Sequence, residues 1–334
     1  MTKPLIALQQ IEKSFRGKRR GHWFNWLKPS PGQDIHALNG VTLTVHSGET
    51  LCLVGETGCG KSTLARVLMG LVEPSAGEVH YRGKRIDQLS EQERMPYRRQ
   101  MQMVFQNPYA SLNPRMTVYQ ILAEAIKLHH PSYGRQQVQD SINELLTSVG
   151  LPLDIQDRLP GEFSGGQRQR IAIARALSVE PEFIVADEPL AALDVSVQAQ
   201  VLNLLMDKQQ ERGLTYLFIT HDLAVVEHIA SRVVVMYLGR ICEIASRESL
   251  FSQPQHPYTQ ALLASIPRLD SLDNAPLQLE GEVPPPTSKP SGCSFCQRCP
   301  LVNQRCYEEV PRLLPQRNGS MVACHAVEEG RAWK

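Results

Sequence analysis

Short apolar runs alternate with amphipathic stretches along most of the chain, from Leu5 to about Ser246. The run Thr50–Val54 has the length and the apolar character of a buried strand. The stretch after it carries apolar residues at the spacing of one helix face, namely Leu64, Val67, Leu68 and Leu71. Because elements that alternate in this way pack as a sheet covered by helices, the pattern predicts an α/β fold.

The apolar runs are too short to cross a membrane. The longest, Val233 to Leu238, has strand length, whereas a membrane helix needs about 20 apolar residues. The segment Met1 to Gln10 lacks the basic and long apolar stretches of a secretion signal. We therefore expect a cytoplasmic protein that reaches a membrane only through partner subunits.

Two segments break the alternation. Arg16 to Asp34 is basic and aromatic, and it suits either a solvated surface loop or a contact with lipid headgroups or membrane subunits. The second segment is rich in proline and is typical of a linker or a stiff wrap; its prolines are Pro284, Pro285, Pro286 and Pro290.

Composition limits the classes of partner and the kinds of cysteine site that the chain is expected to have. The 334 residues suffice for one large domain and a smaller appendage. The 35 basic residues nearly balance the 34 acidic ones, so charge gives no reason to expect nucleic acid as a partner. Five of the eight cysteines crowd the C-terminal tail, which in a reducing compartment favours a metal or cluster site over disulfides.

A glycine-rich loop follows the predicted strand Thr50–Val54 and has the pattern G-x-x-x-x-G-K-[ST]. It consists of Gly55, Glu56, Thr57, Gly58, Cys59, Gly60, Lys61, Ser62 and Thr63. Its curled backbone points amides at phosphates, while Lys61 binds the β- and γ-phosphates and Ser62 offers a hydroxyl to Mg²⁺. This phosphate loop (residues 55–63) predicts an ATP site, in which Cys59 is a small side chain without a redox role.

An apolar run from Glu182 ends in two carboxylates, Asp187 and Glu188. Asp187 suits a ligand of Mg²⁺, and Glu188 suits a base that polarises the attacking water. An acidic pair at a strand end is also common as a helix cap, but the phosphate loop favours the catalytic interpretation.

A second glycine-rich helix start precedes that run and consists of Ser164, Gly165, Gly166 and Gln167, with an amphipathic helix predicted from Gln167 to Ser178. Its hydroxyl and amides can donate to a γ-phosphate. Lys61 already serves the chain's own phosphate, so this signature segment (residues 164–167) is expected to serve the ATP of a neighbour, with a plain serine cap as the alternative.

In order and spacing, these motifs resemble the nucleotide-binding subunits of ABC transporters over roughly Leu5 to Ser246. The resemblance implies an ATPase domain over residues 1–250, with a helical subdomain at about 107–180. It also implies a pair of subunits that sandwich two ATP molecules between the phosphate loop of one chain and the signature segment of the other. The chain has no internal repeat and one set of motifs, so a second subunit must supply the other half.

Further roles follow from the same resemblance. Gln106 matches the glutamine that senses Mg²⁺ and contacts the membrane subunit, so Mg²⁺ is assigned to Ser62, Gln106 and Asp187. His221 matches the switch histidine that holds the γ-phosphate and the water, and Asp194 belongs to the loop at the dimer interface. Phe15 matches the aromatic that stacks on adenine, with alternatives in the basic insertion: Trp23, Phe24 and Trp26.

One position departs from the family pattern. The stretch after the catalytic glutamate usually carries a small hydroxyl residue, whereas Leu190 and Ala191 occur here. Because Glu188 and His221 are both present, hydrolysis is still expected.

The closest branch of the family comprises the ATPases of dipeptide and oligopeptide importers, which also includes nickel and glutathione systems. The segments Ser111–Arg115, Gln198–Leu202 and His256–Leu263 carry this resemblance. The last of them lies outside the ATPase core, so ATP chemistry does not account for it. The branch implies an importer with a paralogous second ATPase subunit, two membrane permeases and an extracytoplasmic solute-binding protein, at the cytoplasmic face of the inner membrane.

The tail, residues 251–334, resembles the cysteine-bearing extension of this branch, which can hold a [4Fe-4S] cluster. The matching positions are Cys293, Cys299, Cys306 and Cys324, with Cys296 as a possible substitute. Thiolates at such spacing suit iron–sulfur or zinc on grounds of softness, and unligated thiols are the remaining alternative.

The sequence thus predicts the ATPase of a peptide importer. The alternatives are a nickel or glutathione importer ATPase and a soluble ABC ATPase without membrane partners. A protein that works mainly in redox chemistry is disfavoured by the complete set of ATPase motifs.

Overall fold

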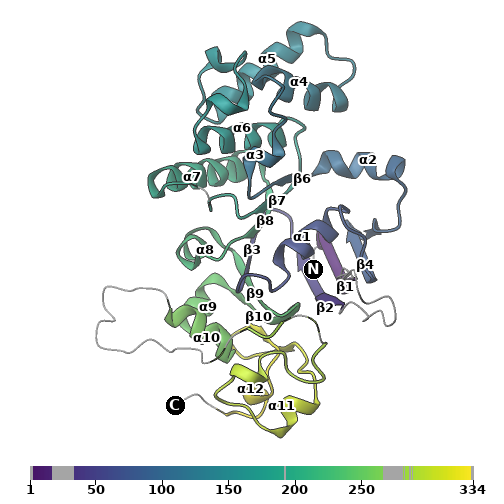
Figure 1. Ribbon diagram of the computed structural model, residues 1–334, viewed down its shortest axis with the longest axis vertical. Helices are drawn as coiled ribbons and strands as arrows, with labels where there is room; N and C mark the ends of the chain where they lie inside the picture. Colours follow the sequence, from purple (N-terminus) through teal and green to yellow (C-terminus); the bar gives the residue numbers. More distant parts are fainter. Residues whose placement is uncertain are drawn as a thin grey trace, which may run out of the picture. The chain divides into compact units, whose positions relative to one another are not determined.

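The protein is described by a computed structural model for residues 3–16, 34–191, 193–265, 281, 283–285, 287 and 289–331 (Figure 1). The chain divides into two compact units. The first comprises residues 1–45, 51–87 and 220–334, and the second comprises residues 46–50 and 88–219. Each unit is described by itself.

The first unit contains an antiparallel sheet of order β2-β1-β4-β5. Its strands are β1 (Ile6–Phe15), β2 (Ile35–Val45), β4 (Ala76–Tyr81) and β5 (Lys84–Arg85). Ile6 and Leu8 at the start of β1 are buried, which is the period-2 pattern of a strand with one face on a core, and the pattern shifts before Ile11, where the pairing has an irregularity.

The same unit contains strands in the order β11-β12-β10-β9-β3. They are β3 (Thr50–Val54), β9 (Arg232–Tyr237), β10 (Arg240–Ser246), β11 (Leu314–Pro315) and β12 (Met321–Val322). The last pair in this order, β9 and β3, is parallel, whereas β12 pairs with β10 antiparallel. The predicted C-terminal extension (residues 251–334) therefore adds its strands β11 and β12 to β10.

The first unit contains α1 directly after β3, then α8 and α9, and several short helices in the C-terminal extension. They are α1 (Lys61–Leu68), α8 (Leu223–Ile229), α9 (Arg247–Ser252), α10 (Pro257–Ala264), the 3₁₀ turn η3 (Cys296–Arg298), α11 (Gln304–Glu308) and α12 (His325–Glu328).

The second unit contains three parallel strands in the order β8-β7-β6. They are β6 (Met101–Val104), β7 (Phe183–Asp187) and β8 (Thr215–Ile219), and every residue of β7 and β8 is buried. Continuous apolar runs of this kind are typical of parallel strands covered on both faces.

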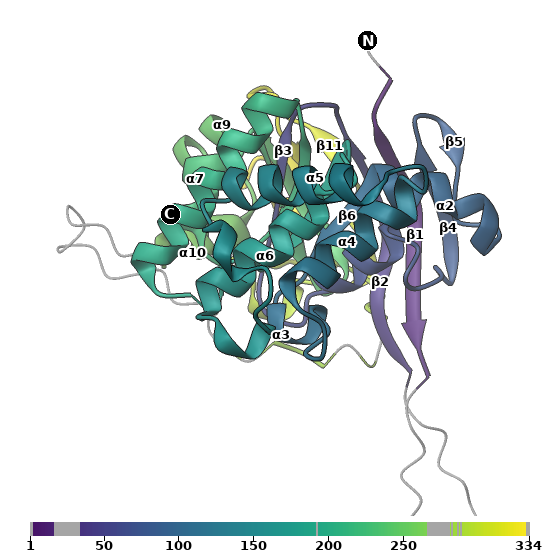
Figure 2. The same ribbon diagram turned by 90° about the horizontal axis from the view of Figure 1, so that it is seen from above.

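Side chains cap the starts of α2, α3, α4 and α6 in the second unit, and α4, α5 and α6 pack on one another (Figure 2). They are α2 (Glu91–Gln100), α3 (Pro108–Ser111), α4 (Val118–His129), α5 (Arg135–Ser148), η1 (Leu153–Ile155), η2 (Pro160–Glu162), α6 (Gly165–Leu177) and α7 (Val195–Arg212). Helix α6 begins two residues before its predicted start at Gln167, because Ser164 caps it.

The observed elements confirm the predicted α/β fold. The strand expected at Thr50–Val54 has those bounds as β3, and β7 lies within the run that was expected to end in carboxylates. Among the described residues, no helix has both the length and the apolar character needed to span a bilayer.

Candidate nucleotide-binding and hydrolysis site

The phosphate loop connects β3 to α1 in the first unit. Gly55 has φ 145° and Gly60, which precedes the helix, has φ 107°, both of which favour glycine. A Cβ at Gly55 would lie 2.2 Å from the carbonyl oxygen of Met236 in β9. The close approach of β9 therefore requires a glycine at the first position of the loop, as the motif predicts.

Lys61 is folded into the loop and is only 5% exposed. Its Nζ donates to the carbonyl oxygens of Gly55 at 2.7 Å and Glu56 at 3.1 Å. These contacts hold a cation at the centre of the loop, where a phosphate would accept from it. Burial raises the pKa of the Cys59 thiol despite Lys61 nearby, so the thiol stays protonated, consistent with a small packing residue.

The predicted catalytic carboxylate lies in the second unit. Asp187 ends the buried strand β7 and is 4% exposed. Glu188 follows it with φ 45°, a region that residues other than glycine rarely adopt, and its N–H donates to the carbonyl of Ile219 at 2.9 Å. Backbone strain of this kind is common at catalytic positions, where it fixes the direction of a side chain.

Gln106 contacts Glu188 directly. Its Nε2 donates to the Oε2 of Glu188 at 2.6 Å. The parallel register of β6 and β7, in which Val104 faces Ala186, brings both side chains to the same edge of the sheet. The sequence assigned each residue its own role, and the structure adds that they form a pair.

The signature segment forms the start of α6. Ser164 is the N-cap, and its Oγ accepts from the N–H of Gln167 at 3.3 Å while its own N–H donates to the Oε1 of Gln167 at 3.1 Å. A Cβ at Gly166 would lie 2.3 Å from Cγ1 of Val197 in α7. The serine cap expected as the plain alternative is thus present, and Gly166 is required for helix packing as well.

The loop between Glu188 and α7 is held by a residue that the sequence did not assign to the site. The Nε2 of Gln198 donates to the carbonyl oxygens of Leu190 at 3.1 Å and Leu193 at 3.0 Å. Asp194 starts α7 through its carbonyl oxygen, with no side-chain cap bond. An amide side chain one turn into the helix after a catalytic loop is the signal that could have identified Gln198.

His221 follows β8 and belongs to the first unit, where it is exposed. The next residue, Asp222, caps α8 by accepting from the N–H of Ala224 at 2.9 Å. His221 therefore stands between a buried strand and a capped helix, whose start fixes its backbone.

Phe15 ends β1 and is 39% exposed, with the Nζ of Lys13 5.2 Å from the centre of its ring. An exposed ring of this kind can stack on a base. The alternative aromatics, Trp23, Phe24 and Trp26, lie outside the described residues.

The site residues divide between the two units. Lys61, Ser62 and His221 belong to the first, whereas Gln106, Asp187, Glu188 and the signature segment belong to the second. Within the second unit the structure brings Gln106 and Glu188 together.

The cysteines of the C-terminal extension are largely buried. Cys293, Cys306 and Cys324 are at most 8% exposed, and burial raises the pKa of Cys293 to about 12 and that of Cys299 to about 11. Thiols suit iron or zinc, but among the described residues no group of three or more Cys, His, Asp or Glu side chains is arranged to hold a metal ion. The described arrangement of the thiols therefore does not fit a cluster.

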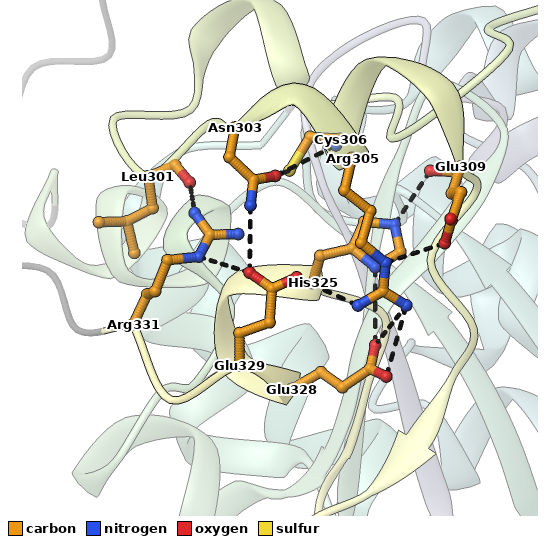
Figure 3. Close-up of polar contacts among 9 residues, drawn as sticks. All are labelled: Leu301, Asn303, Arg305, Cys306, Glu309, His325, Glu328, Glu329 and Arg331. Atoms are coloured by element: carbon orange, nitrogen blue, oxygen red, sulfur yellow. Dashed lines mark hydrogen bonds and ion pairs between the residues drawn. The ribbon is translucent and has the colours of Figure 1, made fainter.

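A network of charged side chains surrounds Cys306 and is shown in Figure 3. Arg305 pairs with Glu309 at 2.8 Å, Glu329 at 3.1 Å and Glu328 at 3.3 Å. The Sγ of Cys306 donates to the Oδ1 of Asn303 at 3.2 Å. Polar side chains from α11 and α12 thus hold this part of the extension together.

Two family descriptions match the chain. Residues 38–191 match "ABC transporter", and residues 242–306 match "Oligopeptide/dipeptide transporter, C-terminal region". The first match spans the phosphate loop, the signature segment and the catalytic strand, and the second spans the start of the cysteine-bearing tail.

Curated relatives resemble the chain over most of its length. The oligopeptide transport ATP-binding protein OppF of Salmonella typhimurium is 47% identical over 314 residues, which cover 93% of this chain and 93% of OppF. The dipeptide transport ATP-binding protein DppF of Haemophilus influenzae is 48% identical over 297 residues, which cover 89% of this chain and 90% of DppF.

Solved structures share the fold. The ATP-binding cassette MJ0796, in a dimeric post-hydrolysis state bound to ADP and Pi, matches with a TM-score of 0.63 and 27% identity over 72% of this chain and 98% of that one. The structure of cbiO1 from Clostridium perfringens, part of the ABC transporter complex cbiONQ, matches with a TM-score of 0.62 and 26% identity over 75% and 92% of the two chains.

Proposed function

The chain belongs to the ATP-binding proteins of ABC-type oligopeptide and dipeptide transporters, and we propose how its residues bind and hydrolyse ATP for peptide uptake. It is the ATPase subunit of such an importer. The observation that carries the proposal is the glycine-dependent phosphate loop between β3 and α1, with the ammonium of Lys61 at its centre. Phosphoryl transfer depends on such positioning and charge neutralisation more than on covalent chemistry.

In this proposal Lys61 binds the terminal phosphates, Glu188 polarises the attacking water and His221 holds the γ-phosphate. Gln106 orients Glu188 through the 2.6 Å hydrogen bond. Mg²⁺ would neutralise phosphate charge, and the hydroxyl of Ser62, the amide oxygen of Gln106 and the carboxylate of Asp187 are oxygen ligands of the kind it prefers. Phe15 is the proposed stacking residue for adenine.

We place the second half of each ATP site on another ATPase subunit. The helix start at Ser164 offers a hydroxyl and backbone amides, and the related cassette MJ0796 forms a dimer. A second ATPase subunit, two membrane permeases and a solute-binding protein would complete the importer at the cytoplasmic face of the inner membrane. Residues 1–250 would form the ATPase domain, with a helical subdomain at about 107–180, and residues 251–334 the C-terminal extension.

Peptide is the proposed solute because both OppF and DppF are named as peptide transport proteins. A nickel or glutathione importer is the alternative that solute uptake assays test, and a soluble ABC ATPase is the alternative that copurification tests. Recovery of this chain with two membrane permeases supports the importer, and recovery only with ribosomes or DNA contradicts it.

A [4Fe-4S] cluster on Cys293, Cys299, Cys306 and Cys324 remains a proposal, with Cys296 as a substitute ligand. It is supported by the spacing of the thiols along the chain, and it requires the thiols to leave their described positions, where no set of ligands is arranged to hold a metal ion. Assays of iron and acid-labile sulfide on anaerobically purified protein test it. Stoichiometric zinc without sulfide would replace the cluster with a zinc site.

The central test is Lys61→Ala in the assembled transporter. Loss of the ammonium leaves the terminal phosphates without their cation, so we expect ATP turnover to fall at least about a hundredfold. Lys127→Ala, a change on helix α4, is the control and should retain turnover. Normal turnover by Lys61→Ala would refute the proposed site.

A further inference from the structure

Glu56 follows Gly55 in the phosphate loop, and its carboxylate, its backbone N–H and its carbonyl oxygen all make hydrogen bonds. Its carboxylate accepts from Nη1 of Arg298 at 2.8 and 3.1 Å. Its N–H donates to the hydroxyl of Tyr258 at 2.9 Å. Its carbonyl oxygen accepts from Nζ of Lys61 at 3.1 Å. The residue that holds the phosphate-binding lysine is therefore itself held by two residues of the C-terminal extension.

Arg298 lies beside Tyr237, with the centre of its guanidinium 5.9 Å from the centre of the ring. Its side chain is 8% exposed, and Nη1 also lies 3.4 Å from the hydroxyl of Tyr237. Tyr237 packs edge-on against Tyr258 and Phe295, with ring centres 4.8 and 5.3 Å apart. A guanidinium in such a low-dielectric setting interacts with its carboxylate far more strongly than an exposed pair does.

The Glu56 carboxylate would oppose nucleotide binding if it stood alone. Its side chain is 25% exposed and it belongs to the loop whose ligand is polyanionic. Like charges at short range in a poorly solvated site repel each other strongly. Arg298 places a positive charge against this carboxylate, and the hydroxyl of Tyr258 holds the backbone N–H of the same residue.

An ion pair of this kind can also be purely structural. Buried pairs often contribute little net stability, and a structural role would change stability without changing affinity for nucleotide. The extension offers a second arginine for comparison, because Arg305, whose side chain is 35% exposed, binds Glu309, Glu328 and Glu329 in a network of its own (Figure 3).

We propose that Arg298 is a positioning residue for ATP binding, which acts from the C-terminal extension through Glu56 on the phosphate loop and Lys61. The inference rests on the proposed function, since it requires that the loop bind ATP. It gives the cysteine-bearing extension a part in the ATP site, because Arg298 lies between Cys296 and Cys299.

Equilibrium binding of MgATP to the full chain tests the inference. Arg298→Met should raise Kd about tenfold, because an uncompensated carboxylate is left on the phosphate loop. The double variant Glu56→Gln/Arg298→Met removes both charges and should return Kd to within about twofold of the wild type. The control Arg305→Met should bind MgATP as the wild type does.

Unchanged affinity in Arg298→Met, equal loss in Arg298→Met and Arg305→Met, or no recovery in the double variant would each overturn the inference. If Arg298→Met does not fold, the single variant Glu56→Gln tests the inference. Removal of the negative charge should tighten MgATP binding by about twofold or more. Weaker binding by Glu56→Gln would refute the inference. A wild-type chain that does not bind MgATP would instead refute the proposed function.

Discussion

At the scale of single residues, the catalytic proposal rests on the geometry of Glu188. Its backbone has φ 45°, and its carboxylate accepts a 2.6 Å hydrogen bond from Gln106. A strained backbone and a short hydrogen bond together fix the direction of the carboxylate, which a general base requires. The sequence predicted the base from its place after an apolar strand, but it did not pair the base with Gln106.

Glu188→Gln should leave MgATP binding intact while ATP turnover falls by about a hundredfold to a thousandfold. The amide keeps the shape of the side chain but cannot accept a proton from water. Nucleotide binding and phosphate release measured on the same preparation check this. The control is Glu182→Gln, a carboxylate just before the start of the same strand, and undiminished hydrolysis by Glu188→Gln would remove this residue from its role.

His256 provides a residue-scale prediction on pH. It is 1% exposed, and burial lowers its pKa to about 3, from 6.5. Between these values the unfolded chain binds a proton that the folded chain does not. The contribution of this group to stability is therefore fully present above about pH 6.5 and is lost as pH falls toward 3.

His256→Asn should weaken the acid dependence of the free energy of unfolding by about 1.4 kcal/mol per pH unit below pH 6. Asparagine keeps an acceptor for the N–H of Tyr258, which His256 Nδ1 accepts at 3.0 Å. Urea unfolding at pH 7 and pH 5 measures the difference, with the exposed His228→Asn as control. Equal pH dependence in wild type and His256→Asn would contradict the prediction.

At the scale of elements, many of the proposed site residues lie at the starts of helices. The sequence located the helices at Lys61 and at the signature segment because loop and cap residues have local signals. It read the glycines of the signature segment as phosphate donors, whereas Gly166 also lets α6 approach α7. It also placed His256–Leu263 outside ATP chemistry, whereas Tyr258 of α10 binds the N–H of Glu56. Both contacts are tertiary, so no local pattern encodes them.

Gly166→Ala should lower the free energy of unfolding by about 1–3 kcal/mol, because its Cβ would lie 2.3 Å from Cγ1 of Val197 and the stiff valine must move. Chemical denaturation measures this loss. Gly161→Ala, whose Cβ would meet no atom within 4 Å, is the control. The double variant Gly166→Ala/Val197→Ala should recover part of the loss, and a Gly166→Ala variant as stable as Gly161→Ala would refute the packing argument.

At the scale of the whole molecule, one chain is expected to supply half of each ATP site. Ser164 heads a helix that offers donors, while Lys61 belongs to the other compact unit of the chain. In the proposed dimer, the signature segment acts on the ATP of the partner subunit. Loss of the donors of the signature segment should therefore lower ATP turnover only in the assembled transporter.

Ser164→Asp separates an effect on the isolated chain from an effect on the assembled transporter. Aspartate is a good N-cap, so α6 should keep its stability, but its negative charge would face the partner's γ-phosphate. We expect MgATP binding by the isolated chain to be unchanged and ATP turnover by the assembled transporter to fall at least about tenfold. Thr117→Asp is the matched control, because Thr117 caps α4 and exchanges the same two hydrogen bonds with Gln120. Full turnover by Ser164→Asp would contradict the shared site.

The sequence by itself determined the α/β fold and the order of the ATPase motifs, because loops, caps and apolar runs are encoded by neighbouring residues. Only the tertiary structure decided which distant groups meet. Gln106 and Glu188 are 82 positions apart, and Glu56 and Arg298 are 242 apart. Such pairs depend on strand register and on the packing of the extension against the core, and neither is encoded in a local pattern.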